Sequence, residues 1–105
     1  MDKVGLKTYI LQDIKMRTVD NPIYSYQLEE RYHVSGVAIR EAVHELRVND
    51  NAVVCSGNKG YYIARDKAEG LRTVAHLKSS AKRNMDAAEG ILKHYEEESG
   101  QLNLL

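Results

Sequence analysis

The feature that most constrains this chain is a capped, one-sided helical segment followed at once by turn-rich β segments. Ser35 is a strong candidate N-cap for a helix from Gly36 to about Val48, which Asn49 ends. Apolar residues at spacings of three and four predict that one face packs into a core: Ile39, Ala42, Val43 and Leu46. The opposite face is then expected to carry Val37, Arg40, Glu41, His44 and Arg47.

Two helical segments are expected before this one. The first runs from Val4 to about Thr18, and the sequence Asp20-Asn21-Pro22 stops it. Its inward residues recur every fourth position: Leu6, Ile10 and Ile14. Ile23-Tyr24 is a candidate for a very short strand. A second helix is expected from Ser25, a candidate N-cap, to Tyr32, and His33-Val34 forms the tight turn into the third helix.

A β-hairpin and a long helix are expected after the third helix. Two β-rich runs, Ala52–Cys55 and Tyr61–Ala64, flank the turn-rich stretch Ser56-Gly57-Asn58-Lys59-Gly60. Asp66 and Glu69 have the spacing of a capping box, which predicts the start of a helix that continues to about Glu98. We therefore expect a mainly α fold with a small β-hairpin, divided into residues 1–65 and a C-terminal helix within residues 66–105.

The last helix carries an imperfect heptad repeat of apolar residues, which indicates a coiled-coil segment. The residues expected to form its dimerisation stripe are Leu71, Val74, Leu77, Ala81, Met85, Ala88, Leu92 and Tyr95. A homodimer is the preferred explanation of this stripe, and a helix folded back on its own domain is the alternative. Basic residues predominate from Lys67 to Arg83 and acidic residues from Asn84 onward, so antiparallel pairing is electrostatically easier than parallel pairing.

Composition limits the functions that the chain can perform. Fifteen basic residues balance fifteen acidic ones, so a nucleic-acid surface would have to come from local segregation of charge. The single cysteine, Cys55, excludes an internal disulfide and fits a reducing, cytoplasmic setting. No apolar run approaches the length of a membrane span, and no secretory signal is expected. The histidines and Cys55 lack metal-ligand spacing, and no catalytic pattern is evident, so we expect neither an enzyme nor a cofactor or metal.

The segment Tyr24–Ala64 resembles the winged helix-turn-helix family of DNA-binding proteins, and in particular small prophage-encoded regulators and replication-associated proteins of bacteria. The helical part of the resemblance rests on Leu28, Tyr32, Val34, Ser35, Ile39, Arg40, Val43, Leu46 and Arg47. The hairpin part rests on Ser56-Gly57-x-x-Gly60-Tyr61-Tyr62. His33 departs from the family, which often has glycine in the turn; histidine tolerates a positive φ better than branched residues do.

This resemblance implies binding to double-stranded DNA, with the helix from Ser35 to Asn49 in the major groove. Arg40 would contact guanine, and Val37 would touch a thymine methyl group. The full implied set is Tyr26, Gln27, Ser35, Gly36, Val37, Arg40, His44, Arg47, Asn58 and Lys59. The function expected is that of a dimeric, sequence-specific regulator of transcription, or a replication accessory, in a bacterial or phage-infected cell. The alternative is a winged-helix module for protein–protein interaction that does not bind DNA.

Overall fold

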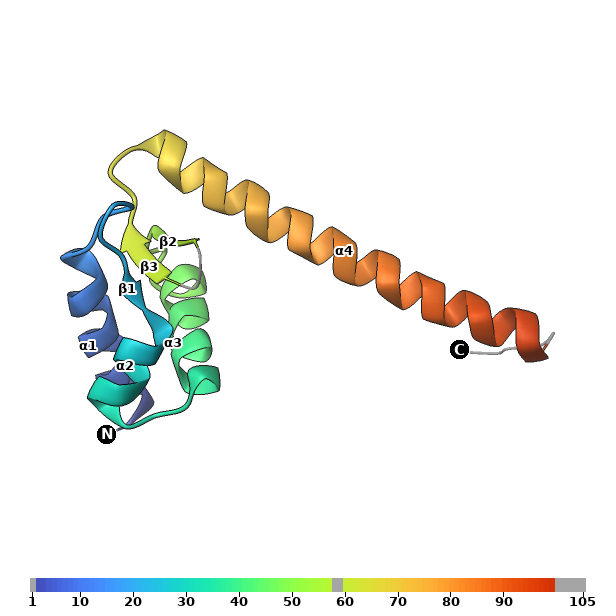
Figure 1. Ribbon diagram of the computed structural model, residues 1–105, viewed down its shortest axis with the longest axis horizontal. Helices are drawn as coiled ribbons and strands as arrows, with labels where there is room; N and C mark the ends of the chain where they lie inside the picture. The colour runs from blue at the N-terminus through green and yellow to red at the C-terminus, as the bar shows by residue number, and fades with distance from the viewer. Residues whose placement is uncertain (1, 58–59, 100–105) are drawn as a thin grey trace. The chain divides into compact units, whose positions relative to one another are not determined.

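The computed structural model describes residues 2–57 and 60–99, and the chain divides into two compact units at the boundary between Thr73 and Val74. The described elements (Figure 1) are, in order, α1 (Lys3–Lys15), β1 (Ile23–Tyr24), α2 (Ser25–Tyr32), α3 (Gly36–Val48), β2 (Val54–Gly57), β3 (Gly60–Ile63) and α4 (Lys67–Ser99). The fold is therefore mainly helical, with a small antiparallel sheet and a long C-terminal helix, as the sequence predicted at this level.

Helix α1 begins one residue earlier and ends three residues earlier than the sequence predicted. The carboxylate of Asp2 accepts a hydrogen bond from the amide of Gly5 at 2.7 Å, which caps the first turn. The predicted inward residues are confirmed as buried: Leu6, Ile10 and Ile14. The helix ends before Thr18 because Thr18 forms an isolated β-bridge with Asn21, which turns the chain towards β1.

The sheet has three antiparallel strands in the order β1-β3-β2, so the short first strand joins the hairpin at its outer edge. Ile23 pairs with Tyr61, and Val54 pairs with Ile63. The second strand begins two residues later than predicted, and the third begins one residue earlier. Gly60 allows β1 to lie close, because a Cβ atom there would stand 2.9 Å from the Cβ of Pro22.

The turn between α2 and α3 has the geometry that the sequence allowed for. His33 adopts a left-handed conformation with φ 54° and ψ 48°. Ser35 then caps α3, since its hydroxyl oxygen accepts a hydrogen bond from the amide of Ala38 at 3.2 Å. The inward stripe of α3 is confirmed as buried, in one core with the inward residues of α1 and with Leu28 of α2: Ile39, Ala42, Val43 and Leu46.

Helix α4 is continuous from Lys67 to Ser99 and is capped differently from the prediction. Asp66 accepts a hydrogen bond from the amide of Glu69 at 2.9 Å, as a capping box requires. The Glu69 carboxylate, however, accepts from the backbone amide and the guanidinium of Arg65, at 3.0, 2.9 and 2.6 Å, rather than from Asp66. These bonds hold the pKa of Glu69 below its usual value. The result is an ion pair that fixes the start of the helix.

Helix α4 carries no stretch that is long and apolar enough to cross a membrane, and neither does any other helix of the described chain.

Candidate functional site

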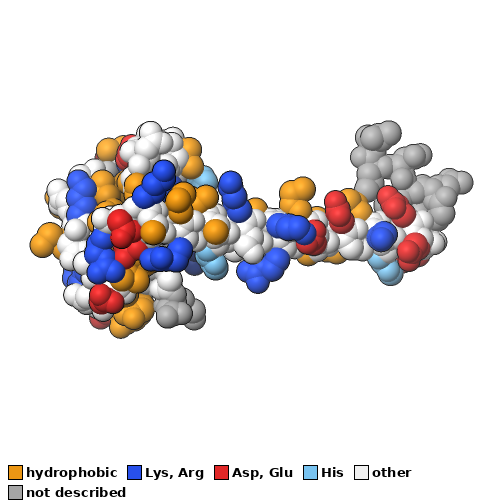
Figure 2. Space-filling view, turned by 90° about the horizontal axis from the view of Figure 1, so that it is seen from above, with side chains coloured by type: hydrophobic (Ala, Val, Ile, Leu, Met, Phe, Trp, Pro, Cys, Tyr) orange, Lys and Arg blue, Asp and Glu red, His pale blue; other side chains and the backbone are white. Residues whose placement is uncertain are grey.

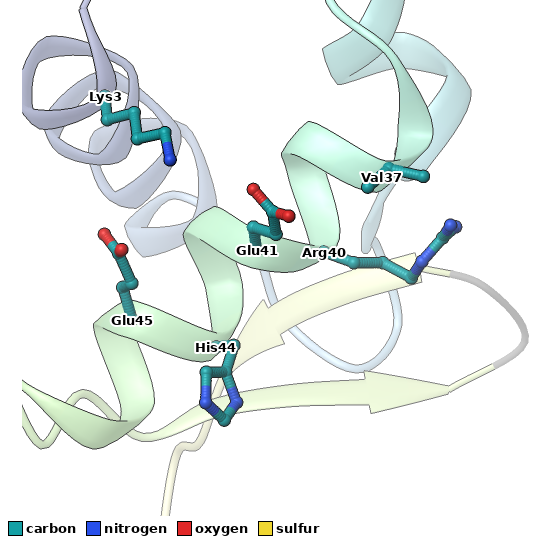
Figure 3. Close-up of a pocket in the computed structure, with 6 residues that line it drawn as sticks. All are labelled: Lys3, Val37, Arg40, Glu41, His44 and Glu45. Atoms are coloured by element: carbon teal, nitrogen blue, oxygen red, sulfur yellow. The ribbon is translucent and has the colours of Figure 1, made fainter.

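The exposed face of α3 is the most distinctive surface of the first unit. It borders an open hollow of about 400 Å³ that is lined by Lys3, Val37, Arg40, Glu41, His44 and Glu45 (Figure 3). Figure 3 shows Lys3, Glu41 and Glu45 gathered at one end, and Arg40 extending away from them. The face therefore divides into a mixed-charge end near α1 and an end where a guanidinium projects.

Arg40 lies beside an acidic side chain of the preceding helix. A Cβ atom built on Gly36 would stand 3.4 Å from Arg40 Nη1 and 3.4 Å from Glu29 Oε2, so both groups border the same point. Glu29 in turn accepts a hydrogen bond from the hydroxyl of Ser25 at 3.0 Å. The charges of Arg40 and Glu29 both act on the Tyr61 hydroxyl, whose pKa burial raises. The guanidinium of Arg40 therefore lies where α2, α3 and β3 meet.

The first turn of α3 presents a small polar and apolar surface. Ser35 is exposed, although its hydroxyl oxygen is occupied by the capping bond to Ala38. Val37 is 55% exposed, so its methyl groups are accessible on the open face. Together with Gly36, these residues allow close approach of a partner to the N-terminal turn of α3.

Two tyrosines stack at the start of α2. The rings of Tyr24 and Tyr26 have centroids 5.9 Å apart and an interplanar angle of 17°. Tyr26 is 64% exposed, so it is accessible, as a contact residue must be. The side chain of Gln27 is already hydrogen-bonded within the chain, because its oxygen accepts a hydrogen bond from the amide of Tyr24 at 2.9 Å. Its carbonyl caps α2, which leaves its amide hydrogens for any further contact.

Arg47 does not lie on the open face that the helical spacing predicted. Its Nε donates to the carbonyl oxygen of Val54 at 3.0 Å, and its Nη2 donates to the hydroxyl of Ser56 at 3.3 Å. Burial lowers the pKa of this guanidinium. Arg47 therefore ties the end of α3 to β2. The predicted loop contacts Asn58 and Lys59 lie outside the described residues.

The predicted stripe of α4 is exposed within the described chain. Exposed fractions are 43% for Val74, 65% for Met85 and 41% for Leu92. The remaining members of the stripe are also exposed: Leu71, Leu77, Ala81, Ala88 and Tyr95. Tyr95 also meets the ring of His94 edge to face, with centroids 5.4 Å apart.

Two residues of the site were not identified from the sequence. Glu29 lies near Arg40 only because α2 and α3 cross after the His33 turn, and Lys3 lines the hollow only because α1 packs on α3. Both are contacts between helices, which periodicity along one helix does not reveal. Among the described residues, no group of three or more His, Cys, Asp or Glu side chains has an arrangement that holds a metal ion.

No protein-family model, no curated protein and no solved structure matches this chain.

Proposed function

We propose that the chain is a winged helix-turn-helix protein that binds double-stranded DNA sequence-specifically, as a homodimer formed through α4. Its role would be that of a phage or prophage-type transcriptional regulator or replication accessory. The observation that carries the proposal is the exposed face of α3, where Val37, Arg40 and His44 project from a helix whose opposite face is buried. A helix that is anchored on one side and open on the other has the form that enters a major groove.

The chemistry of this face suits a small number of base contacts. The guanidinium of Arg40 presents the fork that matches the O6 and N7 atoms of guanine. The methyl groups of Val37, one turn earlier, suit the methyl group of thymine. Ser35 and the first amides of α3 lie at a helix N-terminus, which favours a phosphate.

Arg47 supports this proposal as a positioning residue. Its hydrogen bonds to Val54 and Ser56 hold the β2–β3 hairpin against the end of α3. Asn58 and Lys59, which follow β2 in the sequence, would then contact the DNA backbone. We therefore assign the base contacts to Arg40 and Val37, and the orientation of the hairpin to Arg47.

Selection from a pool of random duplexes tests the proposal directly, because it reveals both binding and the symmetry of the preferred site. The selected duplex is then titrated with Arg40→Ala, which is expected to weaken binding by about 1–3 kcal/mol. Lys15→Ala, an exposed cation at the opposite end of α1 from Lys3, is the control and should change specific binding far less. Equal affinity of Arg40→Ala and the unaltered chain would remove Arg40 from the interface.

A protein-interaction module is the second candidate, and two observations favour it. Glu41 and Glu45 share the hollow with Arg40, and the formal net charge of the chain is zero. Acidic groups on a recognition face repel phosphates and weaken non-specific DNA binding. Measuring duplex affinity over a series of salt concentrations separates the two candidates. DNA binding must weaken steeply as salt rises, whereas absence of binding to any duplex at low salt would favour the protein partner.

A further inference from the structure

The exposed stripe of α4 consists of two rows that differ in side-chain size. One row contains Leu71, Lys78, Met85 and Leu92, and the other contains Val74, Ala81, Ala88 and Tyr95. Each row repeats every seven residues, and together they form the seam of a two-stranded coiled coil. The irregularities are informative: one row carries a lysine, and the other carries two alanines at its centre.

We propose that α4 pairs antiparallel with α4 of a second copy of this chain, in one defined register. In this register Ala81 lies opposite Met85 of the other copy, and Val74 lies opposite Leu92. The same register places Lys78 opposite Ala88, and Leu71 opposite Tyr95. The inference deepens the proposed function and rests on it only for the assumption that the chain dimerises through α4.

Packing favours this register over a parallel pair. In a parallel pair each residue meets its own copy, so Lys78 would face Lys78 and two layers would contain only alanines. Reversing one helix brings the two rows into the same layers, so a small residue of one copy faces a larger residue of the other. Every alanine of the seam then has Met85 or Lys78 as its neighbour, and the two lysines are separated. Small and large residues that alternate across the seam fill it more evenly than identical residues do.

Charge supports the same register independently. Lys67, Arg72, Lys78, Lys82 and Arg83 lie in the first half of α4, and Asp86, Glu89, Glu96, Glu97 and Glu98 lie in the second half. Figure 2 shows this segregation, with blue side chains on the earlier part of the helix and red ones towards its end. The change of sign falls between Arg83 and Asn84. The symmetry axis of the register, midway between Ala81 and Met85, lies at Arg83, next to this change of sign, so each basic half lies along an acidic half.

The residues that flank one side of the seam agree with this arrangement, whereas on the other side Lys82, which is paired with Asp86 of its own helix, approaches its own copy. Leu77 and Ile91 are 42% and 62% exposed, and they lie beside the seam on the same side of the helix. In the proposed register Leu77 of one copy approaches Ile91 of the other, which widens the apolar contact at both ends. Asn84 approaches its own copy at the axis, where the two amides are able to hydrogen-bond to each other.

Cysteine cross-linking of the full chain tests both the pairing and its direction. We expect the double variant Val74→Cys/Leu92→Cys to form covalent dimers under mild oxidation. Each single variant should stay at least about tenfold less cross-linked, because the two copies of either residue lie about 27 Å apart along an antiparallel pair. The native Cys55 is buried and is present in every sample, so the unaltered chain measures its background.

The matched control is His76→Cys/Gly90→Cys, whose residues also lie level with each other in this register but on the outer side of the pair, so it should cross-link far less. A Cβ atom at Gly90 meets nothing within 4 Å, so this change is well tolerated. Efficient cross-linking of Val74→Cys alone or of Leu92→Cys alone would establish parallel pairing and overturn the proposal. So would a monomeric unaltered chain in sedimentation at about 100 µM. Because no DNA is present, these outcomes are independent of whether α3 binds a duplex.

Discussion

Replacing Arg47 by alanine should destabilise the first unit without directly removing a DNA contact. The bond from Nε to the carbonyl oxygen of Val54, at 3.0 Å, is charge-assisted and of normal length. Such a bond contributes about 1.5–3 kcal/mol. The bond to Ser56, at 3.3 Å, lies beyond the usual range and adds little. Burial of the guanidinium opposes both bonds, so we expect a loss of about 2 kcal/mol in the free energy of unfolding.

This loss corresponds to a melting temperature lower by roughly 10 °C for a unit of this size. Near-ultraviolet circular dichroism is the suitable probe, because all tyrosines except Tyr95 lie in the unit that ends at Thr73. Arg47→Lys should restore only part of the stability, since an ammonium group lacks the fork that reaches both acceptors. Lys15→Ala is the exposed control and should change the melting temperature little.

The same variants decide whether Arg47 reads DNA. Below its melting temperature, Arg47→Ala should keep most of its preference for the selected duplex, because Arg40 and Val37 remain in place. The reasoning would be refuted if Arg47→Ala melted like the unaltered chain and yet lost its sequence preference. Arg47 would then contact a base, and its bonds to Val54 and Ser56 would contribute nothing to stability.

Three further predictions concern single residues. Burial raises the pKa of Tyr32 to about 12, from 10.0, so its contribution to the free energy of unfolding is complete below pH 10 and is lost between pH 10 and 12. In urea titrations over this pH range, Tyr32→Phe should remove part of the fall in the free energy of unfolding. His33→Gly should raise the free energy of unfolding by about 1 kcal/mol or less, because glycine adopts φ 54° without strain. The greater flexibility of glycine in the unfolded chain limits this gain. An unchanged or lower urea midpoint would contradict the prediction. Glu29→Gln should strengthen binding to unrelated duplexes at low salt, because it removes a negative charge beside Arg40. Glu30→Gln, on the same helix, should have a smaller effect, and equal effects would argue against a local role.

The helices could largely be predicted from the sequence because their signals are local, although the N-cap of α2 is Tyr24 and not the predicted Ser25. The Ser35 cap and the inward stripe of α3 are encoded within a few residues of one another, and both are confirmed. Helix α4 is continuous through Gly70 and Gly90, although glycine weakens a helix. At Gly70 a Cβ atom would stand 3.0 Å from Val53 Cγ1, so the small residue serves close packing at this turn of the helix.

The position of Arg47 could not be predicted, because it depends on contact between distant segments. Helical spacing places Arg47 seven residues after Arg40 and therefore on the same face of α3. The hairpin that follows α3 covers only the C-terminal part of that face, where Val54 and Ser56 bind the guanidinium. A face that is uniform along the helix axis is thus divided by tertiary packing into an open half and a covered half.

The pairing of charges explains why a dimer matters to the proposed function. Several cations form ion pairs within the described chain: Lys7 with Asp50, Arg31 with Asp13, Arg65 with Glu69 and Asp20, and Lys82 with Asp86. Within the described residues, Arg40 is a cation of the open α3 face that forms no ion pair. One copy therefore neutralises fewer phosphates than two copies do, and its affinity should fall less steeply with salt than that of a dimer. Two copies joined through α4 would present this surface twice, and the second contact would gain from the effective concentration set by the first. The slope of affinity against salt should therefore report how many copies bind, and a small slope would mean that a single unit is engaged.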